Sequence, residues 1–78
     1  MRKYEPLRRY LRRQRDGDCE LTFGEIERLI GALLPNRAAH PSWWAGAPGL
    51  HGEAWTSVGF EAVLSPRQDR VFFRRISV

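Results

Sequence analysis

Apolar residues in the first part of the chain recur at helical spacing. Leu7, Tyr10 and Leu11 fall at positions i, i+3 and i+4, which predicts one buried stripe on a helix over residues 5–15. Pro6 suits the first turn of such a helix, because the amide that it lacks would have no partner there. We therefore expect a short amphipathic helix.

A second helix has the clearest start signal. Residues 22–25 read TFGE, which is typical of a capping box in which the Thr22 hydroxyl accepts from the Glu25 amide and Glu25 accepts from the Thr22 amide. The box predicts a helix that begins after Thr22 and is ended by Pro35. Its expected buried stripe consists of Ile26, Leu29, Ile30 and Leu33. The preceding residues, Cys19–Leu21, suit a short extended strand.

Two shorter helices are predicted in the tryptophan-rich middle of the chain. Residues 36–45 form the first, with a distorted first turn, so that its regular part starts near Pro41. After a loop at residues 46–49, residues 50–58 form the second, which Gly59 closes in a left-handed conformation. Its inward residues are expected to be Ala54, Trp55 and Val58.

The last part of the chain alternates between apolar and polar residues, as half-buried strands do. Phe60–Ser65 and Arg70–Ser77 are the predicted strands, and Pro66–Asp69 is the turn between them. If Cys19–Leu21 pairs with this hairpin, a small three-stranded sheet forms beside the helices.

The order of these elements predicts an α+β fold. We expect one small winged-helix-like domain over residues 1–78, with three to four helices and a C-terminal β-hairpin wing. In this layout residues 36–45 and 50–58 form a helix-turn-helix, and Pro66–Asp69 is the tip of the wing.

Four stretches of the sequence also resemble a known family. They read LTFGEIERLIGALLP at 21–35, AAHPSWW at 38–44, EAWTSVGF at 53–60 and VFFRR at 71–75. This set is similar to the pattern LTFxEIExxxGxxLP, HxxWW, AW and G of a small bacterial winged-helix-like domain family of unknown function, over roughly residues 4–75. Val58 departs from the pattern, which prefers a small residue there. The resemblance implies a DNA-related role, through the nuclease-like modules to which such domains are joined.

Composition excludes several classes of site. The 78-residue chain has one cysteine and two histidines, which argues against a disulfide framework and a metal site. It has no run of about 18 apolar residues and no signal-peptide core. We expect a cytoplasmic protein with no membrane contact and no cofactor. Because Cys19, Ser57 and Ser65 have no acid–base partners nearby in the sequence, we expect no enzyme.

Charge is distributed unevenly. Residues 1–15 carry seven basic side chains and one acidic one, a net charge of +6, whereas residues 16–78 carry six arginines and eight acidic residues, a net charge of −2. Arg8, Arg9, Arg12 and Arg13 repeat at helical spacing and repel one another, and Glu5 is expected to relieve only Arg8 or Arg9. A basic cluster of this kind is typical of nucleic-acid binding.

The predicted function is therefore a small DNA-binding protein. Its first helix and its wing contact phosphates, and its helix-turn-helix faces the groove. The predicted contact residues are Arg8, Arg9, Arg12, Arg13, Arg15, Arg37, His51, Thr56, Ser57, Arg67, Arg70 and Arg74. Because residues 50–58 contain no Arg or Lys, we expect binding to depend on the backbone and shape of DNA more than on its bases. A homodimer would add specificity.

Trp43 and Trp44 leave the use of the aromatic residues open. Adjacent helical residues point about 100° apart, so one Trp is expected to pack with Trp55, Ile26 and Leu29, and the other to lie at the rim with its indole N–H on a polar group. Alternatively, an exposed Trp stacks on single-stranded DNA or RNA bases. The residues assigned to a ligand or stacking surface are His40, Trp43, Trp44 and Arg75.

Two further interpretations stay open. Arg75 shares a strand face with Val71 and Phe73, where it either stacks on a Trp or pairs with a carboxylate. The whole chain can also be a protein-interaction module, an adaptor or antitoxin-like partner, whose basic helix docks on an acidic surface with the rim Trp as anchor.

Overall fold

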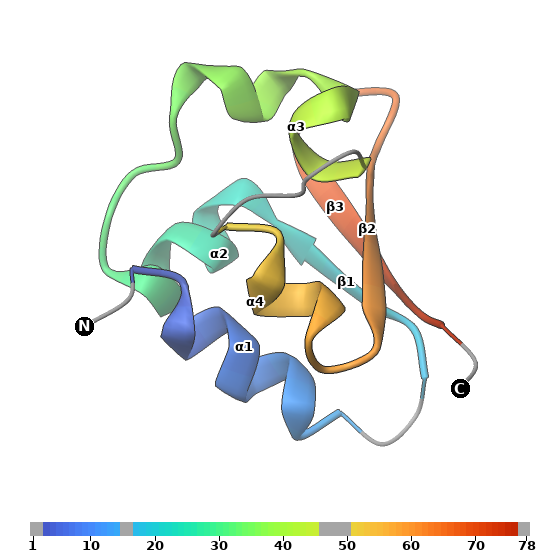
Figure 1. The fold of residues 1–78 in the computed structure, drawn as a ribbon. Helices are drawn as coiled ribbons and strands as arrows, with labels where there is room; N and C mark the ends of the chain where they lie inside the picture. The colour runs from blue at the N-terminus through green and yellow to red at the C-terminus, as the bar shows by residue number, and fades with distance from the viewer. Residues whose placement is uncertain (1–2, 15–16, 46–50, 77–78) are drawn as a thin grey trace.

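Short helices and a small antiparallel sheet share one hydrophobic core in this protein (Figure 1). The computed structural model describes residues 3–14, 17–45 and 51–76. Its elements are α1 (Glu5–Arg12), β1 (Cys19–Thr22), α2 (Phe23–Ile30), the 3-10 helix η1 (Asn36–Ala39), α3 (Pro41–Ala45), α4 (Glu53–Thr56), β2 (Phe60–Leu64) and β3 (Arg70–Arg75).

The strands form a three-stranded antiparallel sheet in the order β1-β3-β2. The Phe73 position on the central strand lies opposite Cys19 on one side and Ala62 on the other. Burial alternates along β2, with Phe60, Ala62 and Leu64 buried and the residues between them exposed, because successive side chains of a strand point to opposite faces. The predicted hairpin and the predicted pairing of its return strand with the first strand are both confirmed.

Helices α1, α2 and α4 lie together on one side of this sheet (Figure 1). The fold class is therefore α+β, as the element order predicts. Within the described residues there are four α-helices, and the C-terminal β2–β3 hairpin forms the sheet together with β1. This arrangement is consistent with a small winged-helix-like domain whose wing is the β2–β3 hairpin.

The core is centred on two tryptophans from different helices. Trp44 and Trp55 are each 1% exposed, with their rings 5.2 Å apart, and both pack against Phe73. The Trp44 indole Nε1–H donates to the buried Ala38 carbonyl at 2.8 Å. Trp43 lies half-buried at the rim, as expected of one member of the pair. The sequence places the hydrogen-bonded indole at the rim, but this hydrogen bond belongs to the core residue Trp44. Without it, the Ala38 carbonyl in η1 would be buried without a donor.

Several helix boundaries differ from the prediction. Gly31 adopts a left-handed conformation (φ 69°) and ends α2 directly after Ile30, so Leu33 is 77% exposed and is not part of the buried stripe. Helix α1 ends at Arg12 rather than at residue 15, and α4 has four residues instead of spanning residues 50–58.

The distorted start of the third helix is confirmed, since η1 precedes the regular α3, which begins at Pro41. The left-handed Gly59 (φ 84°) is also confirmed. The loop predicted at residues 46–49, and Leu50 after it, lie outside the described residues.

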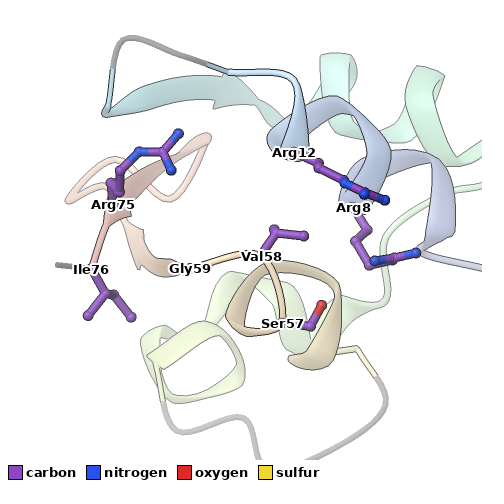
Figure 2. A pocket seen from close by; sticks show the side chains of 7 residues that line it. All are labelled: Arg8, Arg12, Ser57, Val58, Gly59, Arg75 and Ile76. Carbon is purple, nitrogen blue, oxygen red and sulfur yellow. The ribbon is translucent and has the colours of Figure 1, made fainter. Parts of the chain in front are cut away.

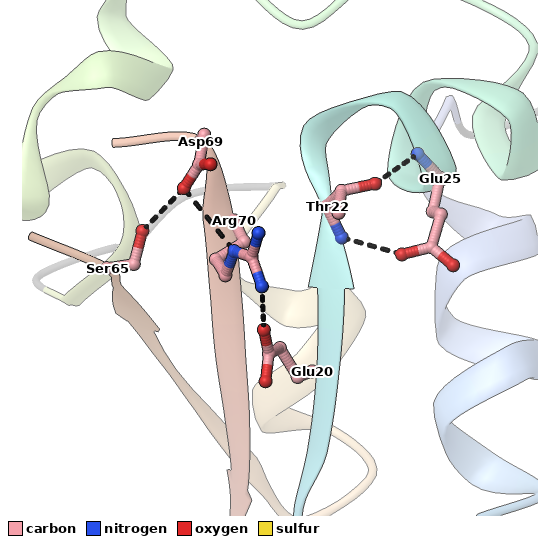
Figure 3. Close-up of polar contacts among 6 residues, drawn as sticks. All are labelled: Glu20, Thr22, Glu25, Ser65, Asp69 and Arg70. Atoms are coloured by element: carbon pink, nitrogen blue, oxygen red, sulfur yellow. Dashed lines mark hydrogen bonds and ion pairs between the residues drawn. The ribbon is translucent and has the colours of Figure 1, made fainter. Parts of the chain in front are cut away.

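The capping box predicted for α2 is present. The Glu25 amide donates to Thr22 Oγ1 at 3.1 Å, and the Thr22 amide donates to Glu25 Oε1 at 2.8 Å (Figure 3). Hydrogen bonding from Thr22 to the carboxylate, from the backbone amide first, holds the pKa of Glu25 below its ordinary value of 4.5. The box lets the chain pass from β1 into α2 without an intervening residue.

Acid is expected to weaken this junction. Because the folded-state pKa of Glu25 is lowered, the stabilisation from its charged form is complete above pH 4.5 and is lost as the pH falls through the lowered value. The Glu25→Gln variant should therefore show a shallower decline of unfolding free energy in this acidic range, measured by urea denaturation at a series of pH values. Glu61→Gln, on the outer face of the sheet, controls for the loss of one carboxylate. If the unfolding free energy of Glu25→Gln falls with acid as steeply as that of the unmodified protein, the stabilising role given to the charged Glu25 is wrong.

The two adjacent tryptophans should differ in their contribution to stability. Trp44→Phe loses buried volume and leaves the Ala38 carbonyl without its donor, which should cost about 2 kcal/mol. Trp43→Phe, at the half-buried rim, should cost less than about 1 kcal/mol. Thermal or urea unfolding of the two variants checks this, and an equal loss for both would contradict the central role given to Trp44.

Candidate nucleic-acid interface

Helix α1 presents a row of arginines to solvent, which we call the basic face: Arg8, Arg9, Arg12 and Arg13. Its orientation is fixed by Leu7 and Leu11, which are both fully buried. Because these two side chains face the core, the arginines occupy the remaining circumference of the helix. Arg9, Arg12 and Arg13 are exposed, and Arg8 is partly buried.

Glu5 neutralises only one end of the basic face. It accepts two hydrogen bonds from Arg8, at 3.0 and 2.8 Å, and lies 3.6 Å from Nε of Arg9. Glu5 thus contacts both arginines, not one of them as the sequence predicts, and its hydrogen bonds raise the pKa of Arg8. Arg12 and Arg13 have no ion pair with any residue that the structure describes.

Arg75 joins the end of β3 to the end of α1. Its Nη2 donates to the Gln14 carbonyl at 2.5 Å, and its backbone amide donates to Asp18 Oδ1 at 3.2 Å. The guanidinium carbon lies 4.8 Å from the centre of the Phe60 ring, the residue directly across the sheet. The predicted ring contact therefore exists, but with Phe60 and not with a Trp, because Phe60 is the cross-strand neighbour.

An open hollow of about 740 Å³ lies between these two groups of arginines (Figure 2). Figure 2 shows Arg8 and Arg12 on one side, Arg75 on the other, and Val58 between them. The hollow is lined by Arg8, Arg12, Ser57, Val58, Gly59, Arg75 and Ile76. Sequence reasoning assigned Arg8, Arg12 and Ser57 to DNA contact and Arg75 to a separate ligand surface, but it did not bring them together.

The floor of the hollow offers few other donors. The backbone amides of Ser57, Val58 and Gly59 donate to carbonyls of α4. The Ser57 hydroxyl donates to the Glu53 carbonyl, and the Ile76 amide donates to the Gly59 carbonyl. Guanidinium groups are therefore the donors that remain for a ligand within the described lining.

The wing contributes less than predicted. Arg70 donates to Glu20 Oε2 at 2.6 Å and lies 3.4 Å from Asp69 Oδ1 (Figure 3), and these partners, Glu20 first, raise its pKa. Desolvation raises the pKa of Asp69, but hydrogen bonds from Ser65 and Arg70 outweigh it and lower the pKa overall. Arg70 is thus engaged within the fold.

Arg67 lies on the exposed turn between β2 and β3, whereas Arg75 lies at the other end of β3, opposite Phe60. Five residue steps along β3 separate the two ends by about 17 Å. The turn adjoins the start of α2, since the Phe23 amide donates to the Asp69 carbonyl at 3.0 Å. The wing tip and the last turn of α1 therefore do not form one continuous surface.

The remaining predicted arginines lie elsewhere. Arg37 is exposed on η1, and Arg74 is exposed on the outer face of the sheet. Arg74 lines a smaller hollow, of about 350 Å³, together with Asp18, Cys19, Glu20 and Phe72. The two carboxylates there disfavour an anion. Arg15 lies outside the described residues.

The aromatic and helix-turn-helix residues are mostly engaged inside the fold. His51 stacks on Trp43, with ring centres 4.0 Å apart, and its Nε2 lies 3.0 Å from the Trp43 carbonyl. Trp44 is buried and is therefore unavailable for stacking on a base. The Thr56 hydroxyl donates to the Gly52 carbonyl. His40 is exposed, and its backbone amide caps η1 by donating to the Arg37 carbonyl.

The described residues offer little support for other site chemistry. They contain no group of three or more His, Cys, Asp or Glu side chains placed to hold a metal ion. Burial raises the pKa of the Cys19 thiol, which disfavours the nucleophilic thiolate. No helix in the described part of the chain has the length and apolar character needed to cross a bilayer.

Comparison with known proteins identifies the family of this chain. Neither the curated proteins nor the solved structures include a match to this chain. The model of DUF7662, described as a domain of unknown function, matches residues 4–76. The match agrees with the expected resemblance to a family of unknown function, but it supports neither the winged-helix assignment of that family nor the sequence pattern. Because the match takes in nearly the whole chain, the protein belongs to the DUF7662 family of domains of unknown function.

Proposed function

We propose that this protein binds DNA by its sugar-phosphate backbone, through the basic face of α1. The observation that carries the proposal is the pair Arg12 and Arg13, which are exposed on a helix anchored in the core and have no carboxylate partner among the described residues. Arg75 adds a third guanidinium beside the same end of α1.

The energetics of α1 support a polyanionic partner. Arg8 and Arg12, and likewise Arg9 and Arg13, are like charges at i,i+4 spacing, and each such pair destabilises a helix by a few tenths of a kcal/mol. Duplex DNA carries one negative charge per about 1.7 Å of its axis. Bound phosphates would turn this repulsion into attraction and release condensed counterions.

Readout of bases has little support. Helix α4 is a single turn without Arg or Lys, and the hydroxyls of Thr56 and Ser57 donate to carbonyls of their own turn. Bidentate contacts to base edges need side chains with free donors or acceptors at the groove. The proposed binding is therefore independent of sequence to first order and dominated by phosphate contacts.

A protein partner is less well supported. That alternative assigns Trp43 as the apolar anchor beside the basic helix, but one face of Trp43 is stacked on His51 and its edge packs with Tyr4. Interface anchors fill pockets of the partner, which requires a freely projecting ring. The arginines alone favour a phosphate backbone, because their planar donors match phosphate oxygens in bidentate geometry.

The salt dependence of DNA binding tests the proposal. Fluorescence anisotropy of a labelled duplex should give a dissociation constant that rises with NaCl, with a logarithmic slope of about 0.9 per phosphate contact. The variant Arg12→Gln/Arg13→Gln removes two contacts and should lower that slope by about 2. Both side chains are exposed without ion pairs in the described residues, so the fold should be retained.

The matched control is Arg37→Gln/Arg67→Gln, which removes the same charge from exposed positions on η1 and on the hairpin turn. It should leave the slope within the error of the unmodified protein. No DNA binding even at low salt would refute the proposal. If the salt slope of the control variant falls as much as that of Arg12→Gln/Arg13→Gln, net charge and not the basic face is responsible for binding.

A further inference from the structure

The hollow between α1 and β3 has the features of a discrete anion site, beyond the general charge of the basic face. Three guanidinium groups from two elements border it, and the single carboxylate that contacts one of them is Glu5 in the described residues. Arg8, Arg12 and Arg75 carry three positive charges, which the neighbouring carboxylates of Glu5 and Asp18 offset only in part. Figure 2 shows these guanidinium groups on two opposite sides of the hollow.

Two of the three arginines are already held in place. Arg75 is fixed by the Gln14 carbonyl and by the Phe60 ring, and Arg8 is fixed by both oxygens of Glu5. A guanidinium has five N–H donors, so each anchor leaves donors available. Side chains that are ordered before binding lose less conformational entropy when a ligand arrives.

The rest of the lining restricts the chemistry of the ligand. Val58 is half-buried and Ile76 is 44% exposed, so both present apolar surface beside the guanidinium groups (Figure 2). The backbone amides and the Ser57 hydroxyl donate inside the fold. A suitable ligand therefore combines acceptor-only anionic oxygens with an adjoining apolar group, which describes a phosphate ester attached to the carbon face of a deoxyribose.

The geometry points to the hollow as the seat of one phosphate ester of the DNA strand, held between Arg12 and Arg75, with its sugar against Val58 and Ile76. This inference rests on the proposed DNA binding. It adds that one phosphate is bound at a fixed place, whereas the basic face alone would hold phosphates diffusely. The source of the ester is either an internal diester or a terminal 5′-monoester, whose charge is about −2.

Sequence neighbours provide a matched pair of variants. Arg12→Gln/Arg75→Gln removes two charges that border the hollow, and Arg13→Gln/Arg74→Gln removes two charges immediately beside them in the chain that do not border it. Both double variants have the same net charge. We call Arg12→Gln/Arg75→Gln the hollow variant and Arg13→Gln/Arg74→Gln the neighbour variant. In anisotropy titrations at one low salt concentration, the hollow variant should bind duplex DNA at least about tenfold more weakly than the neighbour variant.

Folding is controlled separately, because Arg75 also fastens β3 to α1. Circular dichroism and urea unfolding establish that each variant is folded at the assay temperature. If Arg12→Gln/Arg75→Gln does not fold, the comparison is made between Arg12→Gln and Arg13→Gln, which are both exposed and have no ion pair among the described residues. The first should still lose several-fold more affinity than the second.

Two duplexes of one sequence, with and without 5′-phosphates, identify the source of the ester. Tighter binding of the phosphorylated duplex, abolished in the hollow variant, supports a terminal monoester. Equal binding of the two, weakened equally in the hollow variant, supports an internal diester. If the hollow variant and its neighbour variant lose the same affinity, the inference is overturned while the proposed DNA binding stands. If the unmodified protein binds neither duplex, both fail.

Discussion

The contact of Arg75 with Gln14, just after the end of α1, determines where the charges of this protein meet. Its guanidinium donates to the Gln14 carbonyl and covers the Phe60 ring, while its backbone amide binds Asp18. These contacts fasten the end of the central strand to the segment that links α1 to β1. Without them, the basic face would be a charged surface on one helix. With them, guanidinium groups from the two ends of the chain border one hollow.

A small domain can tolerate such a cluster of like charges only if its core is well packed. Domains of this size bury about 60% of the surface that the unfolded chain exposes, and their stability amounts to only about 0.05–0.15 kcal/mol per residue. Here the Trp44–Trp55–Phe73 cluster supplies large buried rings, and the Trp44 indole satisfies a carbonyl that the core would otherwise leave unpaired. Leu7 and Leu11 pack α1 against that core. The stability of the whole domain therefore offsets the repulsion among the arginines of α1.

Local signals in the sequence were sufficient for much of the fold. The capping box at Thr22 and Glu25 and the alternation along Phe60–Leu64 depend on residues within a few positions, and both are present in the structure. The prediction that Leu33 is buried was wrong, because the spacing of apolar residues does not show that Gly31 adopts a left-handed conformation and ends α2 before Leu33. The stacking of His51 on Trp43, and the covering of Phe60 by Arg75, depend on tertiary packing that no local pattern encodes. The hollow could not be predicted for the same reason, although most of its polar residues had been singled out individually.

If the protein binds DNA as proposed, the separation of its two basic regions limits how it can lie on the duplex. The two ends of β3, one next to the hairpin turn that carries Arg67 and the other at Arg75, are about 17 Å apart, a distance greater than the width of the major groove, about 12 Å. On the proposed function, a docking mode that places the basic face and the hollow against one strand uses few phosphates: about three, if Arg12 and Arg75 share one and Arg9 and Arg13 each contact another. The loss of affinity with added salt grows with the number of phosphate contacts, so three contacts give a shallow salt slope but also only weak binding at physiological salt concentration. Tight binding in that range requires a second DNA contact in the same assembly, such as a second copy of this chain, because linked sites raise the effective concentration of each other. On the proposed function, the homodimer expected from the sequence would serve affinity at least as much as specificity.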